Sequence, residues 1–200
     1  MVDKLYETIE KLSSNNQRIR TDNITLYGGE PLMKQNKDAV TYLVKQGMER
    51  GFTFSAITNG YDLDCFEALL SPNAIKFVQI TIDGIPERHN KRRIHAQGVP
   101  TFDKIVNNIG MALRHGVKVS VRVNTDSDNI EDLKALNGIF SKLHYTENDL
   151  FSMYSALLRD YSTNGKETYR YLNQAEYIKK LQAMKMESAC KDYGLSRKIF

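Results

Sequence analysis

Short runs of β-branched and aromatic residues alternate with longer amphipathic stretches along this chain. Such alternation is the pattern of repeated strand–helix units, which fold into a parallel sheet with helices packed on its faces. The intervals between the runs suit the right-handed crossovers that join parallel strands. The predicted strands are Asn23–Tyr27, Thr53–Thr58, Phe77–Ile82, Lys118–Val123 and Phe151–Leu157.

Stretches with apolar residues at helical spacing fill these intervals. In the stretch Asp38–Arg50, Leu43 and Val44 share one helical face, and Gly51 follows where a helix stop is expected. The chain opens with a helix that runs into a strand, whereas a β-α barrel would place another strand before that helix. We therefore expect an α/β fold, a partial TIM-like (βα)6-type parallel barrel whose first strand is missing. The other predicted helices are Val2–Ser13, Asp64–Leu70, Thr101–His115, Ile130–Leu143 and Ala175–Tyr193.

Composition narrows the class of protein. The chain has 200 residues, of which 41% are hydrophobic, so it can bury the core of one domain. Its net charge of +4 comes from basic residues interleaved with acids, so we expect no nucleic-acid partner. It has no apolar run of about eighteen residues and no leader at Met1, so we expect no membrane partner and a cytoplasmic location. Cys65 and Cys190 lack metal-type spacing, which argues against a disulfide framework or a self-contained metal site.

Polar residues follow the first two predicted strands. Ligands of parallel α/β folds gather at the carboxyl ends of the strands, so these positions are candidate binding residues. Gly28 and Gly29 let the backbone approach a ligand closely, and the carboxylate of Glu30 can accept hydrogen bonds from an ammonium group. Thr58 and Asn59 could hydrogen-bond a polar ligand, but they are equally suited to an ordinary turn.

The third predicted strand leads into an acidic and then a basic segment. Thr81 and Asp83 share one strand face by period two. The run Lys91-Arg92-Arg93 could bind a carboxylate or form a solvated loop, and both interpretations stay open. We expect His89 and His95 to be surface histidines, because no third metal ligand lies near them in the sequence.

The fourth predicted strand has one polar face. Arg122 and Asn124 alternate with Val121 and Val123, and in a barrel the polar face points inward, where an unpaired arginine is unfavourable. Arg122 therefore needs an anion. Either the carboxylate of Asp83 or the carboxylate of a bound ligand could supply it, and both alternatives stay open.

Taken together, these strand ends resemble the radical S-adenosylmethionine (SAM) superfamily. The likeness is to the branch with a SPASM or twitch extension, which includes anaerobic sulfatase-maturating and peptide-maturase enzymes. It extends from about Ile24 to Leu158, and several motifs that are weak singly occur in the family's order. The matching segments are Gly28-Gly29-Glu30-Pro31-Leu32, Thr58-Asn59-Gly60, Gln79 to Gly84, His89 to Arg93, Gly98 to Ile105 and Arg122-Val123-Asn124.

The resemblance implies a set of SAM-binding residues. The SAM amino group would be bound by Gly28, Gly29 and Glu30. The SAM carboxylate would lie near Arg122 or an arginine of the 92–93 pair. It assigns no catalytic residue; Asp83, Tyr154 and Asp160 are candidates for proton transfer. The complete expected SAM-binding set is Gly28, Gly29, Glu30, Pro31, Thr58, Asn59, Thr81, Asp83, Arg93, Arg122 and Asn124.

The family's cofactor is a four-iron four-sulfur cluster held by a Cys-x-x-x-Cys-x-x-Cys motif, which this sequence lacks. The resemblance implies that the parent enzyme cleaves SAM to a 5′-deoxyadenosyl radical and modifies a peptide or protein side chain, with a reductant protein as second partner. We expect residues 1–158 to be a truncated barrel core, and residues 159–200 to be a loop and helix leading toward a missing C-terminal extension. Such a fragment should bind no metal, be inactive alone and self-associate through its exposed sheet edge.

Two alternatives remain. A cluster-free domain could bind SAM or a partner protein without catalysis. An ordinary metabolic β-α barrel could use Glu30, Asp83 and the basic segment to bind an acidic small molecule.

Overall fold

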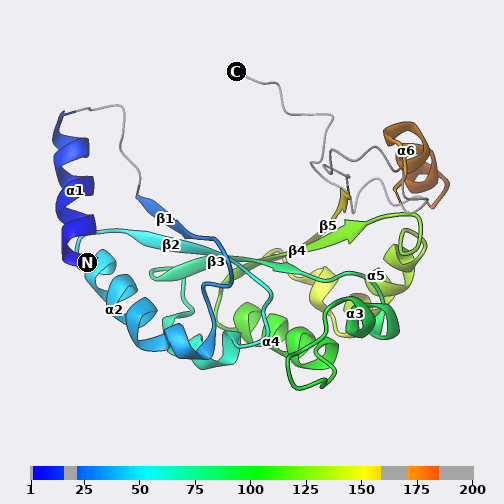
Figure 1. The fold of residues 1–200 in the computed structure, drawn as a ribbon, viewed down its shortest axis with the longest axis horizontal. Coiled ribbons are helices and arrows are strands. Elements are labelled where there is room, and N and C mark those ends of the chain that lie inside the picture. Colours follow the sequence, from blue (N-terminus) through cyan, green and yellow to red (C-terminus); the bar gives the residue numbers. More distant parts are fainter. Residues whose placement is uncertain (1, 16–21, 159–170, 185–200) are drawn as a thin grey trace. The chain divides into compact units, whose positions relative to one another are not determined.

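A computed structural model describes residues 2–15, 22–158 and 171–184 (Figure 1). Its five strands form one parallel sheet in the order β1-β2-β3-β4-β5, which confirms the predicted α/β class. In the first pair, Asn23 lies opposite Thr53 and Leu26 opposite Ala56. The strands are β1 (Asn23–Leu26), β2 (Thr53–Thr58), β3 (Ile75–Thr81), β4 (Lys118–Thr125) and β5 (Phe151–Leu157).

The helices follow the predicted order with two corrections. The stretch predicted as a helix from Asp64 is a 3-10 helix, η2 (Leu63–Leu69). The run Lys91-Arg92-Arg93, for which a solvated loop was one interpretation, lies partly in a helix, because Lys91 and Arg92 end α3 (Pro86–Arg92). This helix begins with Pro86, whose fixed φ suits a first helical turn. The helix predicted over Ala175–Tyr193 is described only to Ala183. The remaining elements are α1 (Val2–Asn15), η1 (Lys34–Asn36), α2 (Lys37–Met48), α4 (Phe102–Arg114), α5 (Asp132–Lys142), η3 (Tyr145–Glu147) and α6 (Gln174–Ala183).

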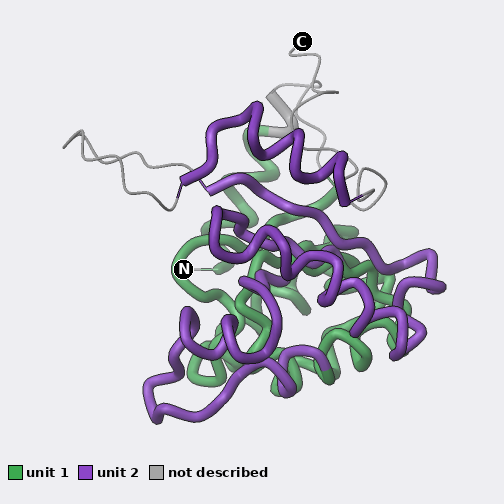
Figure 2. The backbone as a smooth tube through the Cα atoms, turned by 90° about the vertical axis from the view of Figure 1, so that its right-hand side faces the viewer, with its two compact units in different colours: residues 1–79, 107–119 green, residues 80–106, 120–200 purple. Residues whose placement is uncertain are grey.

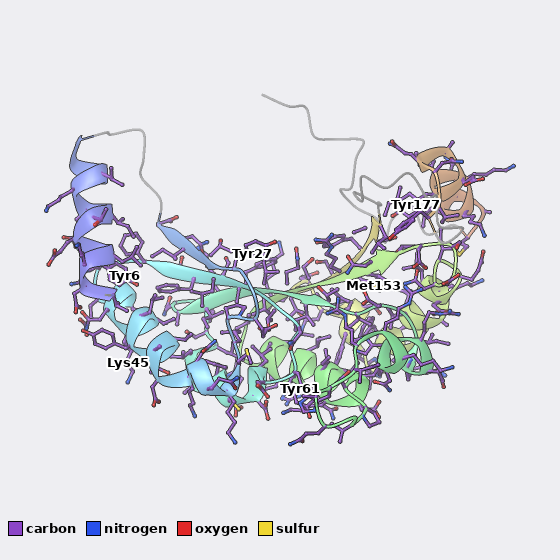
Figure 3. The ribbon with its side chains drawn as sticks, in the orientation of Figure 1. Tyr6, Tyr27, Lys45, Tyr61, Met153 and Tyr177 are labelled. Carbon is purple, nitrogen blue, oxygen red and sulfur yellow. The ribbon has the colours of Figure 1, made fainter. Side chains whose placement is uncertain are left out.

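The chain divides into two units (Figure 2). Unit 1 comprises residues 1–79 and 107–119. Helix α1 is anchored in it by Tyr6, which is buried and whose hydroxyl donates to the Leu43 carbonyl oxygen at 2.7 Å (Figure 3). Gly47 is needed beside this contact, because a Cβ there would collide with the Phe54 ring and the Tyr6 hydroxyl. The buried face of α2 therefore includes Gly47 as well as Val44, which was predicted to lie on it.

Unit 2 comprises residues 80–106 and 120–200, as far as they are described. Val121 and Val123 of β4 are completely buried. Helix α6 is fastened to β5 by Tyr177, whose hydroxyl lies 2.7 Å from Ser155 Oγ and 3.0 Å from the Ser155 carbonyl oxygen (Figure 3). Ser155 Oγ in turn lies 2.6 Å from Thr125 Oγ1. Across the described residues, every helix is too short or too polar to cross a bilayer.

Candidate functional site

The turn after β1 has an unusual backbone. Gly28 and Gly29 have φ angles of +101° and +54°, which favour glycine. Nothing lies within 4 Å of a Cβ built at either position, so the backbone there is open to an approaching molecule. The preceding residue, Tyr27, is 77% exposed at the end of β1 (Figure 3). The structure thus presents bare backbone at the place where the sequence predicted it.

Glu30 joins the end of β1 to the end of β2. Its Oε1 accepts from Thr58 Oγ1 at 2.5 Å and from the Leu32 backbone N–H at 3.1 Å. Its Oε2 accepts from the Asn59 N–H at 2.5 Å. A carboxylate has about four acceptor positions, so roughly one remains for an outside donor. An ammonium group bound by Glu30, as predicted, would therefore share this carboxylate with hydrogen-bond donors of the chain itself.

The turn after β2 is held by its own side chains. Thr58 Oγ1 accepts from the Gly60 N–H at 3.0 Å, and Asn59 Oδ1 accepts from the Tyr61 N–H at 2.8 Å. Asn108 of α4, which the sequence analysis missed, donates to the carbonyl oxygens of Gly60 at 2.8 Å and Tyr61 at 3.0 Å. Thr58 and Asn59 therefore shape this turn, and their contact with a ligand stays a prediction. In unit 1 the structure brings together Gly28, Gly29, Glu30, Pro31, Thr58 and Asn59.

In unit 2, the arginines of α3 and the residue after it form ion pairs. Arg88 Nε lies 2.7 Å from Asp132 Oδ2, and Arg92 Nη2 lies 2.9 Å from Asp126 Oδ1. Arg93 Nε lies 2.8 Å from Asp83 Oδ2. Of the basic run Lys91-Arg92-Arg93, predicted either as a solvated loop or as a ligand-binding segment, the two arginines thus pair with carboxylates of their own chain.

His89 corrects the sequence analysis most clearly. It was predicted to lie on the surface, but its side chain is completely buried. Its ring meets the ring of Phe102 edge-on at 5.7 Å, and Nε2 lies 3.1 Å from Thr101 Oγ1. Burial, and next the nearby Arg93 charge, lowers the pKa of His89 from 6.5 to about 4. A lone histidine in a charged segment carries no sequence signal for such burial.

Arg122 differs from the other arginines described in unit 2. The Ile82 N–H donates to the Arg122 carbonyl oxygen at 2.9 Å, which sets Arg122 beside the end of β3. Its Nε is buried and has no hydrogen-bond partner among the described residues. Asp83, the protein carboxylate considered for it, pairs with Arg93 instead, and Asp83 Oδ1 is likewise buried without a described partner. A buried donor and a buried acceptor without partners are each unfavourable unless a ligand completes them.

The other residues of unit 2 that were predicted to bind SAM or to transfer a proton lie in β3, β4 and β5, except for one outside the described residues. Thr81 ends β3, and Asn124 lies in β4 two positions after Arg122. The Asn124 carbonyl oxygen accepts from Asn129 Nδ2 at 2.8 Å. Tyr154 is buried in β5, and Asp160 lies outside the described residues. In unit 2, Thr81 and Asp83 therefore lie at and just beyond the end of β3, where Arg93 pairs with Asp83. Arg122 and Asn124 lie in the second half of β4.

The residues present do not fit an iron–sulfur cluster. Such a cluster needs three thiolates, whereas the sequence has only Cys65 and Cys190. The structure describes Cys65 alone, in η2, as a free thiol. In the described part of the chain, no group of three His, Cys, Asp or Glu side chains is placed to hold a metal ion.

Comparison with known proteins gives a family match over most of the chain. Residues 2–137 match the sequence model of the radical SAM superfamily. A Methanocaldococcus jannaschii protein, whose name places it among glycyl-radical enzyme activating enzymes, is 26% identical over 132 residues, covering 63% of this chain and 54% of its own length. An S-adenosylmethionine-dependent nucleotide dehydratase of Psychrobacter lutiphocae is 28% identical over 120 residues, covering 58% of this chain and 40% of its own. The chain thus spans about half the length of the curated relatives it matches.

A solved structure shares the fold at low sequence identity. The native enzyme anSMEcpe with bound AdoMet and the Kp18Cys peptide superimposes with a TM-score of 0.62 at 20% identity, covering 89% of this chain and 50% of that one. Similarity at this level of identity extends to the fold alone. It agrees with the partial barrel predicted from the sequence.

Proposed function

Since the chain belongs to the radical SAM superfamily, we propose that residues 1–158 form the SAM-binding core of an enzyme that modifies a peptide or protein side chain. When bound and reduced, SAM supplies a 5′-deoxyadenosyl radical that can abstract a hydrogen atom. The peptide class is suggested by the solved structure of anSMEcpe, which has AdoMet and the Kp18Cys peptide bound. We also propose that the enzyme is of the SPASM or twitch branch, as the sequence motifs indicate.

The buried Nε of Arg122, which has no partner among the described residues, is the observation that carries this proposal. This Nε is withdrawn from water without a described partner, although three other arginines of unit 2 have carboxylates. Arginine binds a carboxylate with paired, charge-assisted hydrogen bonds. We therefore assign Arg122, in preference to Arg92 or Arg93, to the carboxylate of SAM. Asp83 Oδ1, the unpartnered acceptor of the same unit, would take a hydrogen-bond donor of the ligand.

The cluster ligands belong outside residues 1–200 in this proposal, because the sequence contains too few cysteines to hold the cluster. The partial coverage of the relatives supports this view. We propose that the 200-residue chain alone yields no 5′-deoxyadenosine, and that a longer chain with the cysteine motif yields it in the presence of a reductant. One edge of β1, the first strand in the sheet order, pairs with no other described strand, and we propose it as the place where a further strand joins or where copies associate.

Calorimetry with SAM tests the role of Arg122. In the protein expressed from the complete reading frame, Arg122→Met should weaken SAM binding at least about tenfold, equivalent to about 1.4 kcal/mol. Arg122→Lys should keep part of the affinity, since lysine retains the charge but not the paired donors. Arg114→Met, which removes an exposed arginine at the end of α4, is the matched control and should change affinity less than about twofold.

Thermal unfolding without ligand gives an independent readout. Because Arg122 buries a donor without a described partner, Arg122→Met should leave the ligand-free protein as stable as the wild type or more stable. SAM affinity that Arg122→Met leaves unchanged would refute the assignment of the SAM carboxylate to Arg122. Tight SAM binding with no 5′-deoxyadenosine from the complete chain under reducing conditions would favour the cluster-free binding domain.

A further inference from the structure

The loop after β3 is tied back to α3 by a buried histidine. The Asp83 backbone N–H lies 3.2 Å from His89 Nδ1. A backbone N–H can only donate, so Nδ1 must be the accepting nitrogen, and the neutral ring carries its hydrogen on Nε2. Nε2 lies 3.1 Å from Thr101 Oγ1 and therefore donates to that hydroxyl. The donors of the first two hydrogen bonds in this chain are thus known: the Asp83 N–H donates to His89, and His89 donates to Thr101.

The chain then returns to its starting residue. Thr101 Oγ1, which accepts from His89, can donate its own hydrogen to the Arg93 carbonyl oxygen at 3.4 Å. The Arg93 side chain donates from Nε to Asp83 Oδ2 at 2.8 Å. Asp83, His89, Thr101 and Arg93 therefore form a closed ring of hydrogen bonds, here called the Asp83 ring. All four residues belong to unit 2.

Two asparagines support the Asp83 ring from outside. Asn90 Oδ1 accepts from the backbone N–H groups of Thr101 at 2.8 Å and Phe102 at 3.0 Å, which fixes the start of α4. Asn129 Nδ2 donates to the Asp83 carbonyl oxygen at 3.1 Å. The N–H, the carbonyl and Oδ2 of Asp83 are thus all engaged. Of its polar atoms, Oδ1 alone has no partner among the described residues, and it is buried.

We propose that His89 and Thr101 are positioning residues that hold the Asp83–Arg93 pair, so that Asp83 Oδ1 is preorganised to accept a hydrogen bond from a hydroxyl or ammonium group of the bound ligand. The inference rests on the proposed function, because it concerns the same site. Neither His89 nor Thr101 touches the ligand. Their contribution is to remove the freedom that Asp83 would otherwise lose on binding.

Amide and side-chain hydrogen exchange, followed by NMR without ligand, tests the Asp83 ring directly. In the wild-type protein the ¹⁵N shifts of His89 should show hydrogen on Nε2 and none on Nδ1. Thr101→Val keeps the shape of the side chain but removes the hydroxyl, and should speed exchange at the Asp83 amide and the Arg93 Nε–H at least about tenfold. Thr101→Ser restores the hydroxyl and should keep both rates within about threefold of the wild type.

The control site for this experiment is the Val123 amide in β4, which is buried but lies outside the ring. Faster exchange confined to Asp83 and Arg93 supports the positioning role. An equal increase at Val123 would show general loosening of the unit and would overturn the inference. Hydrogen on Nδ1 of His89 would also overturn it, because the first link would then be impossible.

Ligand binding separates this inference from the proposed function. Thr101→Val should weaken SAM binding about fivefold, and Thr101→Ser should leave it within about twofold of the wild type. Normal SAM binding in Thr101→Val would reject the positioning role while leaving the proposed function intact. If the wild-type protein bound no SAM, the proposed function would fail and the ligand-facing role of Oδ1 with it, whereas the exchange rates would still decide whether the ring exists.

Discussion

The protein should become less stable as the pH falls, and replacing His89 with asparagine should abolish the part of this loss that comes from protonation of His89. Burial, and next the Arg93 charge, lowers the pKa of the His89 ring in the folded protein to about 4, whereas its ordinary value is 6.5. Between these values the unfolded chain binds a proton that the folded chain does not, so the free energy of unfolding falls as the pH falls. Each unit of difference corresponds to about 1.4 kcal/mol, which gives about 3 kcal/mol in total. This stability is fully present above pH 6.5 and is lost as the pH approaches about 4.

Urea unfolding at several pH values between 7 and 4 measures this effect. The wild type should lose about 3 kcal/mol more than His89→Asn over this range, because carboxylates contribute to both proteins and cancel in the difference. Val44→Ala is the control, since it removes buried apolar atoms in unit 1 without removing a titrating group or a contact of His89, and should keep the wild-type slope. Parallel pH profiles for wild type and His89→Asn would refute the reasoning. If His89→Asn did not fold, an NMR titration of the wild-type ring would decide, and a midpoint near 6.5 would refute it equally.

Substitutions at three further positions test other contacts. Glu30→Ala should lower the free energy of unfolding by about 3 kcal/mol in urea titrations, because it leaves three donors without their acceptor, and Glu30→Gln should cost less because one oxygen remains. Gly84→Ala should lower the melting temperature by several degrees, since the residue has a φ of +126° and a Cβ would lie 2.6 Å from Asp132 Oδ2. Tyr177→Phe should increase proteolytic cleavage at α6 by removing the hydroxyl that bonds to Ser155, and an unchanged cleavage rate would count against that anchor.

The strands could be predicted because their signal is local. In the strand Thr53–Thr58, Phe54 and Ala56 take the buried positions, as a period of two in the sequence predicts. The pattern fails only at the end, where Ile57 is partly buried and Thr58 is buried. The burial of His89 could not be predicted in this way, because it depends on Thr101, twelve positions along the chain, and on the turn after β3. Short helix α3 likewise has charged residues where a helical period of apolar residues would be needed to reveal it.

The candidate site shows the same division. Glu30 could be picked out by its place after a predicted strand, but not its partners, because the contact with Thr58 spans 28 positions and exists only once β1 and β2 are paired. Strand position thus selects candidate residues, and pairing between strands decides how each one is used. Whether Arg122 pairs with Asp83 was a question that the sequence left open and the three-dimensional arrangement answers.

The distribution of charge in unit 2 gives Arg122 a different role from its neighbours. Helix α3 and the residue that follows it carry Arg88, Arg92 and Arg93, and each of these side chains reaches a carboxylate of its own chain. Arg122 cannot exchange places with them, because it alternates with Val121 and Val123, whose burial fixes which face of β4 its side chain must take. One positive charge is therefore held where no described carboxylate neutralises it. The proposed SAM carboxylate would remove this imbalance, so we expect ligands without an acidic group to bind this site more weakly than SAM.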